Sequence, residues 1–486
     1  MRHTVLALPA LLLMLLGTAK AQPSDWSTRV SPEAARADLA ALYAGLQSAH
    51  YDLYVHRSRE DYDARFAQTM AALGAPLTRF ELLLELQKFT AYGNVAHARI
   101  DFPTDAYRSF RDDGGRAFPI YPRIVDGRTY VGEDYSGSDQ VALGDEILSI
   151  DGEPMARWLE RTARYISADT RYIAHSLLES SFPMYLWVEL GERRYFTLQI
   201  RKQDGRSHRV RIPARTSDEL AAAMDDAPEV FELDFSAREA RMLDEEVAYL
   251  RPGPFYNAED PQRIWNTSAF DAFVDDAFES FLDKGARSLV IDLRNNPGGD
   301  NSFSDHMISW IGDRPFRFAS KFLVRSSDEA AASNQARLDA SPDATQGVSA
   351  SYARAYQTTP RGETFEFDIP LAQPRQGARF EGKVYVLVNR NSYSNAVSVA
   401  AIFQDYGWGE IAGEPTADFA TTYGAMEHFT LPNTGFRVGF PKAYIIRPSG
   451  DERLGGVQPD FVIETPIVPS ARDVVLDRLL GRIAGS

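Results

Sequence analysis

Residues 384–400, VYVLVNRNSYSNAVSVA, predict a buried strand that turns within a few residues into a helix. The run VYVLV is continuous and apolar, which is typical of a strand buried on both faces of a largely parallel sheet. Ser392, Ser394 and Ser398 mark the junction. A serine here is a favoured N-cap residue, but it can also be a nucleophile, because such a turn holds the hydroxyl out of the core. Considered alone, the stretch favours capping.

A second strand, turn and helix occupy residues 288–307, SLVIDLRNNPGGDNSFSDHM. The consecutive glycines Gly298 and Gly299 let the backbone approach a ligand closely and expose free N–H groups. Such donors suit a phosphate or an oxyanion, and a tight turn without a ligand explains the sequence equally well. The turn matches neither a P-loop nor a GxGxxG motif. Because strands and helices alternate over residues 245–470, we predict an α/β fold with a mixed sheet.

The length of 486 residues is too great for one hydrophobic core and indicates several domains. Apolar residues at helical spacing precede Gly93, and alternating runs around Asp126-Gly127 and near Asp204-Gly205 indicate β-hairpins. The predicted order is a helical N-terminal domain that includes a strand opening at His97 (22–115), a β domain (116–215), a linker (216–244) and the α/β domain (245–486).

Residues 325–375 interrupt the alternation of the α/β domain. They are rich in serine, alanine, aspartate, glutamine and proline, and they show little apolar periodicity. A segment of this length without secondary structure is usually a lid or a mobile loop. We therefore predict an insertion of that kind.

The N-terminus has the pattern of a secretory signal peptide. A positively charged start, MRH, is followed by the apolar block VLALPALLLMLLG and by Ala19-Lys20-Ala21, which fits a cleavage site before Gln22. The apolar block is too short to span a bilayer comfortably. We predict that residues 1–21 are removed and that the mature protein is periplasmic or secreted, without stable insertion in a membrane.

Composition excludes several classes of chemistry. The chain has no cysteine, so disulfides, thiol nucleophiles and cysteine-ligated metals are excluded. Its net charge is −16 and it has no basic run of five or more residues, which argues against nucleic acid as a partner. The reaction that we consider below needs no metal and no other cofactor.

A serine nucleophile needs a base, and the chain has eight histidines, of which His3 lies in the predicted signal peptide. His97 stands out because it opens a predicted strand directly after Gly93 and Asn94. His306 lies inside a predicted helix, and His428 lies between predicted strands. A single histidine is more often structural, so the residues alone leave the choice open.

Several segments resemble the tail-specific and tricorn-core serine peptidases. They are LVIDLRNNPGGD (289–300), VYVLVNRNSYSNAVSVAAIFQDYGWGEIAGEPT (384–416) and GGVQPDFVI (455–463), in the order of that family. GDEILSIDG (144–152) is similar to the end of a PDZ module, and GNVAHARIDFP (93–103) resembles the segment that supplies a catalytic histidine in the tricorn type. The resemblance implies a crotonase-like (ClpP-type) catalytic domain, a PDZ-like β domain and peptide or unfolded-protein substrates.

This family has two catalytic versions. In the processing peptidases a lysine roughly two dozen residues after the serine is the base, but residues 391–441 contain no lysine and the next is Lys442. The resemblance therefore implies the serine–histidine version, with His97 as the base.

Aligning SYSNA with the nucleophile motif places the reactive hydroxyl on Ser394, with Ser392 as a turn former and Ser398 on the helix flank. The implied oxyanion hole uses the N–H of Asn395 and an N–H of the Gly298-Gly299 turn. Asn395 departs from the small residue that the family usually has there.

The supporting acid implied by DERLGGVQPD (451–460) is Glu452, with Asp451 as the alternative.

Two other functions stay open. A binding protein without catalytic activity could use the same scaffold, and so could another serine hydrolase such as an esterase. The PDZ-like segment lacks a recognisable carboxylate-binding loop, so a degenerate module is as consistent with the sequence as a working one. Oligomeric state is not predicted.

Overall fold

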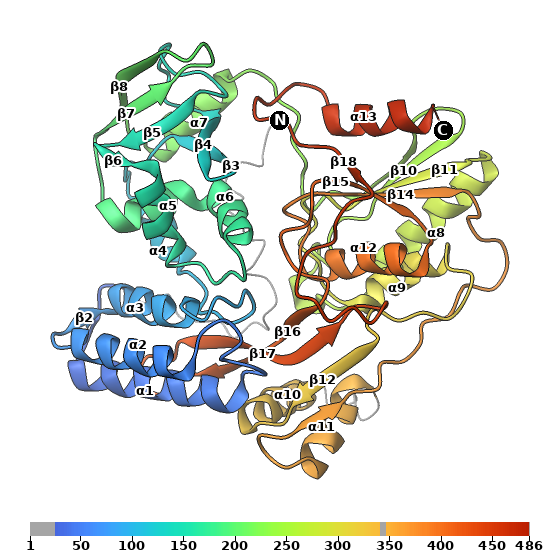
Figure 1. Cartoon of the computed structure of the whole chain (residues 1–486), viewed down its shortest axis with the longest axis horizontal. Coiled ribbons are helices and arrows are strands. Elements are labelled where there is room, and N and C mark those ends of the chain that lie inside the picture. Colours follow the sequence, from blue (N-terminus) through green and yellow to red (C-terminus); the bar gives the residue numbers. More distant parts are fainter. Residues whose placement is uncertain (1–24, 341–346, 486) are drawn as a thin grey trace.

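The computed structural model describes residues 25–340 and 347–485, and they form a mixed α/β structure (Figure 1). Three larger sheets and one short two-stranded ladder are present among these residues. The predicted signal peptide, residues 1–21, lies outside the described part. No helix in residues 25–340 or 347–485 is long and apolar enough to cross a membrane.

The N-terminal part is helical, as predicted. It consists of β1 (Arg29–Val30), α1 (Pro32–Ala49), α2 (Arg59–Ala72), β2 (Leu77–Thr78) and α3 (Arg79–Ala91). Ser31, Ser58 and Thr78 cap the three helices with their side chains. The helices share a buried apolar cluster with the distant residues Val438 and Phe440, so this part does not have a separate core.

The capping box at α3 leads to a stability prediction. Thr78 accepts the N–H of Glu81, and the Glu81 carboxylate accepts the N–H and the hydroxyl of Thr78, which lowers the Glu81 pKa. Thr78→Ala should reduce the free energy of unfolding by about 0.5–2 kcal/mol at pH 7. A lowered carboxyl pKa adds stability only above its unfolded value, so the difference from wild type should shrink as pH falls below about 4. Urea unfolding at pH 7 and pH 3 tests this, and a difference that does not depend on pH would contradict it.

The predicted strand at His97 is not present. Residues 93–103 form turns and extended backbone, with a single β-bridge between Arg99 and Gly439. The alternation of polar and apolar residues in HARIDFP has no counterpart in burial, because the residues from His97 to Ile100 are all buried. It does not reflect a ladder of backbone pairs.

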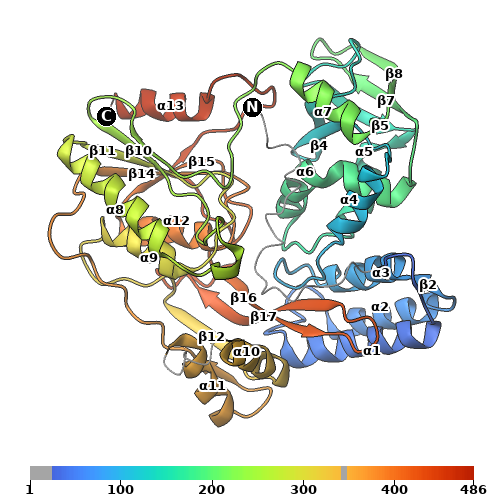
Figure 2. The ribbon, with the colours of Figure 1, turned by 180° about the vertical axis from the view of Figure 1, so that it is seen from behind.

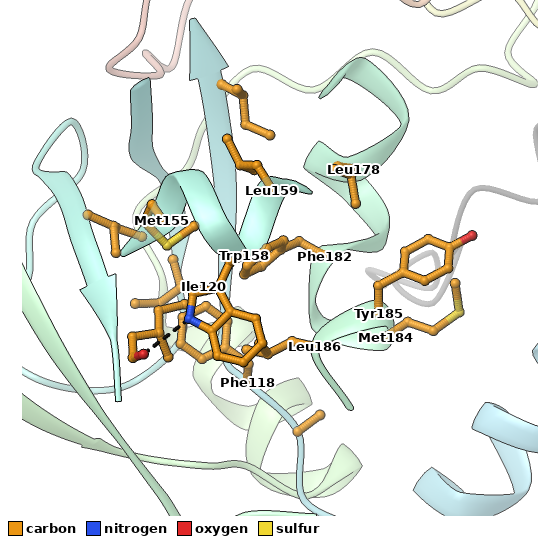
Figure 3. Packing of buried hydrophobic residues seen from close by; sticks show 14 of the residues in the cluster. Phe118, Ile120, Met155, Trp158, Leu159, Leu178, Phe182, Met184, Tyr185 and Leu186 are labelled. Carbon is orange, nitrogen blue, oxygen red and sulfur yellow. Dashed lines mark hydrogen bonds between the residues drawn. The ribbon is translucent and has the colours of Figure 1, made fainter. Parts of the chain in front are cut away.

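The next part contains a sheet in the order β3-β4-β5-β7-β8, with β6 beside β5. Asp126 and Gly127 both have positive φ, at 50° and 75°, as the predicted hairpin turn requires. Helices cover the sheet, and Trp158 and Phe182 lie between them in the core (Figure 3). The elements are α4 (Thr104–Asp112), β3 (Ile120–Val125), β4 (Arg128–Asp134), β5 (Glu146–Ile150), β6 (Glu153–Pro154), α5 (Met155–Ala163), α6 (Arg171–Leu190), β7 (Tyr195–Arg201) and β8 (Ser207–Pro213).

The segment predicted as a linker, residues 216–244, contains regular structure. Thr216 caps α7 (Ser217–Asp226), and β9 (Glu239–Met242) pairs antiparallel with β10 (Val247–Arg251). This pairing makes β9 the edge strand of the central sheet. Its sequence is polar, as suits an edge strand, so a search for continuous apolar runs does not detect it.

The central sheet has the order β18-β15-β14-β11-β10-β9 and is parallel from β10 to β18. Apolar residues on one face of its strands pack with α8, α9 and α12, and those on the other face pack with α13, as Figure 1 shows. The predicted runs at 288–292 and 384–388 are neighbouring buried strands. The elements are η2 (Pro261–Arg263), α8 (Ser268–Asp283), β11 (Ser288–Asp292), α9 (Asn301–Ser309), β14 (Lys383–Val388), α12 (Asn395–Tyr406), β15 (Glu410–Gly413), β18 (Phe461–Val462) and α13 (Val474–Ile483).

The third sheet has the order β13-β12-β17-β16. Its strands are β12 (Lys321–Arg325), β13 (Thr364–Glu366), β16 (Thr422–Thr430) and β17 (Arg437–Ile446). The hairpin of β16 and β17 reaches from the central sheet to the N-terminal helices, which is visible in Figure 2. It thereby connects parts of the chain that are more than 300 residues apart in sequence.

The prediction that residues 325–375 form a structureless insertion is wrong for its described residues. They contain α10 (Asp328–Ala340) and α11 (Val348–Thr358). Arg337 and the buried Lys442 both pair with Glu427, which fixes α10 to the hairpin. Ala330 of α10 and Tyr352 and Tyr356 of α11 also join the buried apolar cluster of the N-terminal helices, so tertiary contacts hold these helices although apolar periodicity is weak.

Candidate active site

Ser394 lies at the junction of β14 and α12 in a conformation that is rare for a residue with a side chain. Its φ is 52° and its ψ is −121°, and its hydroxyl makes no capping hydrogen bond. Such backbone strain costs about 1–3 kcal/mol and persists where the surrounding structure imposes it. The capping interpretation therefore has no support at Ser394, although the residue occupies the N-cap position.

The other two serines have structural contacts. The hydroxyl of the buried Ser392 donates to Leu293 O at 2.8 Å and accepts the N–H of Asn389 at 3.1 Å, so Ser392 forms the turn. Ser398 lies inside α12, where its N–H donates to Ser394 O. The sequence predicted Ser392 as a turn former and Ser398 as a residue on the flank of the helix.

The diglycine turn packs directly against the Ser394 turn. A Cβ on Gly298 would lie 2.5 Å from Tyr393 O and 2.7 Å from Asn395 N, and a Cβ on Gly299 would lie 2.1 Å from Phe255 O. Both glycines have positive φ. Only glycine fits at either position, because an added carbon would overlap backbone atoms of the neighbouring turn.

Two backbone N–H groups of these turns have no hydrogen-bond partner among the described residues. Within residues 25–340 and 347–485, neither Asn395 N nor Gly299 N donates a hydrogen bond, whereas Gly298 N donates to Asn296 Oδ1 at 2.9 Å. The side chain of Asn395 is buried and donates to Ser304 Oγ at 2.9 Å. It therefore points into the core between α12 and α9, so an asparagine at this position leaves its backbone N–H available.

His97 lies beside the Ser394 turn. Its imidazole stacks on the ring of Tyr393, with centroids 5.7 Å apart and the planes at 24°. His97 is buried, and its Nδ1 has no hydrogen-bond partner among the described residues. The preceding residue, Ala96, donates its N–H to Asp169 Oδ2 at 3.0 Å, and Asp169 Oδ1 lies 3.6 Å from His56 Nε2.

The other histidines considered as bases lie in different surroundings. His306 lies on α9, and its Nε2 is 2.7 Å from Oδ1 of Asp275 on α8. His428 lies on β16, where burial lowers its pKa to about 4. In the described part of the chain neither contacts Ser394.

The structure does not bring Glu452 into contact with His97. Glu452 is exposed, and its backbone oxygen accepts the hydroxyl of Tyr444 at 2.9 Å. Asp451, the alternative acid, pairs with Arg453 at 2.7 Å, and this hydrogen bond lowers its pKa to about 2. No hydrogen bond or ion pair joins either carboxylate to His97 in residues 25–340 and 347–485.

Asp418 was not predicted as a site residue, yet it contacts the Ser394 turn. Its side chain is buried, and Oδ2 accepts the N–H of Ser394 at 2.6 Å. Burial raises the Asp418 pKa, and the nearby charge of His97 and the Ser394 N–H oppose that rise. Asp418 lies 24 residues after Ser394, where the resemblance led us to search for a lysine.

Arg390 is a second residue near the site that the sequence did not indicate. It follows β14 and donates to Glu414 at 3.2 Å, to Glu179 at 3.0 Å and to Ile124 O at 2.7 Å. Arg123 completes the group by pairing with both glutamates, at 2.9 and 2.7 Å. This buried group of four charges, which we call the Arg390 network, joins the Ser394 turn to β3 and α6.

A strained serine beside a buried histidine and two free N–H groups can perform acyl transfer. The serine would attack a carbonyl carbon, the histidine would accept its proton, and the two N–H groups would bind the oxyanion. The described residues contain no cluster of three or more histidine, aspartate or glutamate side chains that could hold a metal ion.

The chain is similar to one family model and, in its fold, to several solved structures. Residues 248–463 match the family model described as Peptidase family S41. The structure of mature CPAF complexed with lactacystin is similar at a TM-score of 0.64 and 17% identity, covering 93% of this chain and 97% of that one. A second structure of mature CPAF has a TM-score of 0.61 and 18% identity, covering 93% and 96%. The photosystem II D1 C-terminal processing protease has a TM-score of 0.44 and 15% identity, covering 92% and 97%. No curated protein sequence matches the chain.

Proposed function

We propose that this chain is a serine peptidase in which Ser394 is the nucleophile and His97 the general base, and the match of residues 248–463 to the model of peptidase family S41 supports this. The observation that carries this proposal is the conformation of Ser394, which is strained at φ 52° and makes no capping bond. Strain at a residue with no structural task is typical of a functional site. Peptides or proteins are the substrates of such an enzyme.

In the proposed reaction, His97 accepts the proton of Ser394 as its hydroxyl oxygen attacks a peptide carbonyl carbon. The tetrahedral oxyanion is stabilised by the N–H groups of Asn395 and Gly299, the two that have no other partner among the described residues. His97 then gives the proton to the leaving amine. Water hydrolyses the acyl-enzyme by the same steps in reverse, with His97 again as the base.

The diglycine turn gives a prediction about catalysis. Gly298→Ala would place a methyl group against Asn395 N and so displace one oxyanion donor, which should lower kcat about 10²–10³-fold. The matched control is Gly285→Ala, because Gly285 also has positive φ, at 72°, but a Cβ there meets no atom within 4 Å. Both variants should lose about 1 kcal/mol of stability from backbone strain, and Gly298→Ala should lose more because its methyl group also overlaps backbone atoms of the Ser394 turn. Equal activity in the two variants would show that the turn has no catalytic part.

The finer domain assignments are also proposals. We propose that the central sheet with α8, α9 and α12 is a crotonase-like catalytic domain, that residues 116–215 are a PDZ-like module, and that the protein is secreted after cleavage at Gln22. The supporting features are the parallel sheet with helices on both faces, the five-stranded order β3-β4-β5-β7-β8, and the sequence of residues 1–21. Glu452 stays the acid that the sequence predicts.

A fluorophosphonate probe tests the proposed function, because it reacts only with an activated serine. The wild-type protein should be labelled at Ser394 and should hydrolyse unfolded protein or peptide substrates. Absence of labelling together with intact binding of peptides would instead support the alternative, a binding protein on the same scaffold. Faster hydrolysis of esters than of peptides would point to the esterase.

A further inference from the structure

The loop between β15 and β16 holds a buried carboxylate next to the Ser394 turn. This loop is fixed by the segment GGVQ at 455–458. Thr416 exchanges hydrogen bonds with Val457, and Ala420 N donates to Gly455 O at 3.0 Å. A Cβ on Gly456 would lie 2.0 Å from Thr416 O, so the loop packs directly on this glycine. The GGVQPD motif therefore holds the loop that carries Asp418 in position, although Asp418 lies outside the motif.

Asp418 has one engaged and one free carboxylate oxygen. Oδ2 accepts the N–H of Ser394 at 2.6 Å, and Oδ1 is buried without a hydrogen-bond partner among the described residues. An ionised carboxylate accepts hydrogen bonds at both oxygens, and leaving one buried and unpaired costs about 1–3 kcal/mol. A buried oxygen of this kind needs a donor nearby.

The complementary free group is on His97. Its Nδ1 is buried without a partner, and its ring lies on Tyr393, the residue just before the N–H that Asp418 binds. Asp418 binds the N–H of Ser394, and the ring of His97 stacks on the side chain of Tyr393, so both lie beside neighbouring residues of one turn. The other buried carboxylate near His97 is Asp169, but its two oxygens already face Ala96 N and His56. No carboxylate, Asp418 included, forms a hydrogen bond or ion pair with His97 in the described residues, so the contact proposed below requires a small movement of the two side chains.

We propose that Asp418, rather than Glu452, is the positioning residue of His97: its free Oδ1 accepts the Nδ1–H of the imidazole while its Oδ2 holds the backbone of Ser394. This inference rests on the proposed function. The Nδ1–H bond fixes the tautomer that leaves Nε2 free to accept the Ser394 proton, and the carboxylate stabilises the imidazolium. The proton passes from Ser394 to Nε2 and then to the leaving amine, and Asp418 stays ionised throughout.

Two substitutions separate Asp418 from Glu452. Asp418→Asn keeps an oxygen for the Ser394 N–H but removes the charge, and in a serine peptidase such a change lowers kcat by up to about 10⁴. We expect a loss of at least about 10²-fold in kcat with little change in KM. Glu452→Gln, at an exposed carboxylate, should change kcat less than about threefold. If Glu452→Gln is the inactive variant and Asp418→Asn is not, the assignment is overturned.

A pH profile distinguishes positioning from a structural role. The charged and titratable groups near His97 are Tyr393, on which its ring stacks, Asp418, whose pKa the charge of His97 lowers, and Asp169, which binds Ala96 N and has His56 beyond it. Arg99, two residues along the chain, interacts with Tyr393 as well. Removing the Asp418 charge destabilises the imidazolium, so the acidic limb of the kcat/KM profile should move to lower pH. A purely structural loss would lower the whole profile without moving this limb, and would overturn the proposal.

A double variant covers the possibility of misfolding. If Asp418 acts through His97, then Asp418→Asn should cost little further activity in a His97→Ala background, since residues that act as a unit are strongly non-additive. Full additivity would contradict the proposal. Failure of the proposed function is seen separately: wild-type protein would then not be labelled by the fluorophosphonate probe. Labelled wild type with a fully active Asp418→Asn variant overturns only the present inference.

Discussion

Ser394→Ala should lower peptide hydrolysis by about 10⁴–10⁶-fold, because no other group can form the acyl-enzyme. The hydroxyl of Ser394 caps nothing, so its removal should leave the melting temperature nearly unchanged. His97→Ala should lower kcat to a similar extent, since nucleophile and base act as one unit. Hydrolysis of a fluorogenic peptide and thermal unfolding of each variant measure the two effects. Wild-type activity in either variant would remove that residue from the mechanism.

Ser394→Gly separates catalysis from backbone strain. Glycine adopts positive φ freely, so this variant should be more stable than Ser394→Ala by about 1 kcal/mol while remaining equally inactive. If Ser394→Gly is more stable than Ser394→Ala and equally inactive, then the positive φ at position 394 costs stability and the serine side chain is needed for activity. Equal stability of the alanine and glycine variants would contradict the argument from φ.

Arg390→Ala should cost the largest amount of stability, about 3–5 kcal/mol, because it leaves Glu179 and Glu414 buried without one of their cations. Burial alone would raise the pKa of Glu414, but the charges of Arg123 and Arg390 lower it below its usual value. A lowered carboxyl pKa contributes stability above the unfolded value, near 4.5, and loses it as pH falls. The cost of Arg390→Ala should therefore decrease below about pH 4.

A matched control for Arg390 is Arg453→Ala. Arg453 also pairs with a carboxylate, that of Asp451, but its side chain is 90% exposed. Exposed pairs contribute about 0–1 kcal/mol, so this variant should unfold close to wild type. Denaturant unfolding compares the two. An Arg390→Ala variant that loses no more than Arg453→Ala would show that the Arg390 network contributes little to stability.

Much of the fold follows from local sequence. Continuous apolar runs predicted β11 and β14 and their parallel neighbours, because only strands buried on both faces have that composition. The helices α1 to α3 were predicted from caps and periodicity. The edge strand β9 and the helices α10 and α11 were missed. Their positions depend on pairing with β10, on the ion pair of Arg337 with Glu427, and on burial of Tyr352 and Tyr356 in the apolar cluster of the N-terminal helices. Local periodicity does not record such tertiary contacts.

The site was predicted only in part. The structure places His97, Ser394, Asn395 and the diglycine turn together, although the roles of these residues remain proposals. Glu452 was chosen from its distance to GGVQPD, and the structure leaves its carboxylate exposed. Asp418 was missed because an aspartate in a loop is ordinary in sequence. Only its burial against the N–H of Ser394 distinguishes it.

The hairpin of β16 and β17 has a consequence for when activity can arise. His97 lies on a segment whose neighbour Arg99 exchanges backbone hydrogen bonds with Gly439 of β17, and Ser394 is itself almost 300 residues away in sequence. Nucleophile and base therefore meet only after the C-terminal hairpin has docked on the N-terminal helices. Because Ser394 and the hairpin both lie near the C-terminus, a nascent chain can form a working pair only near the end of its synthesis.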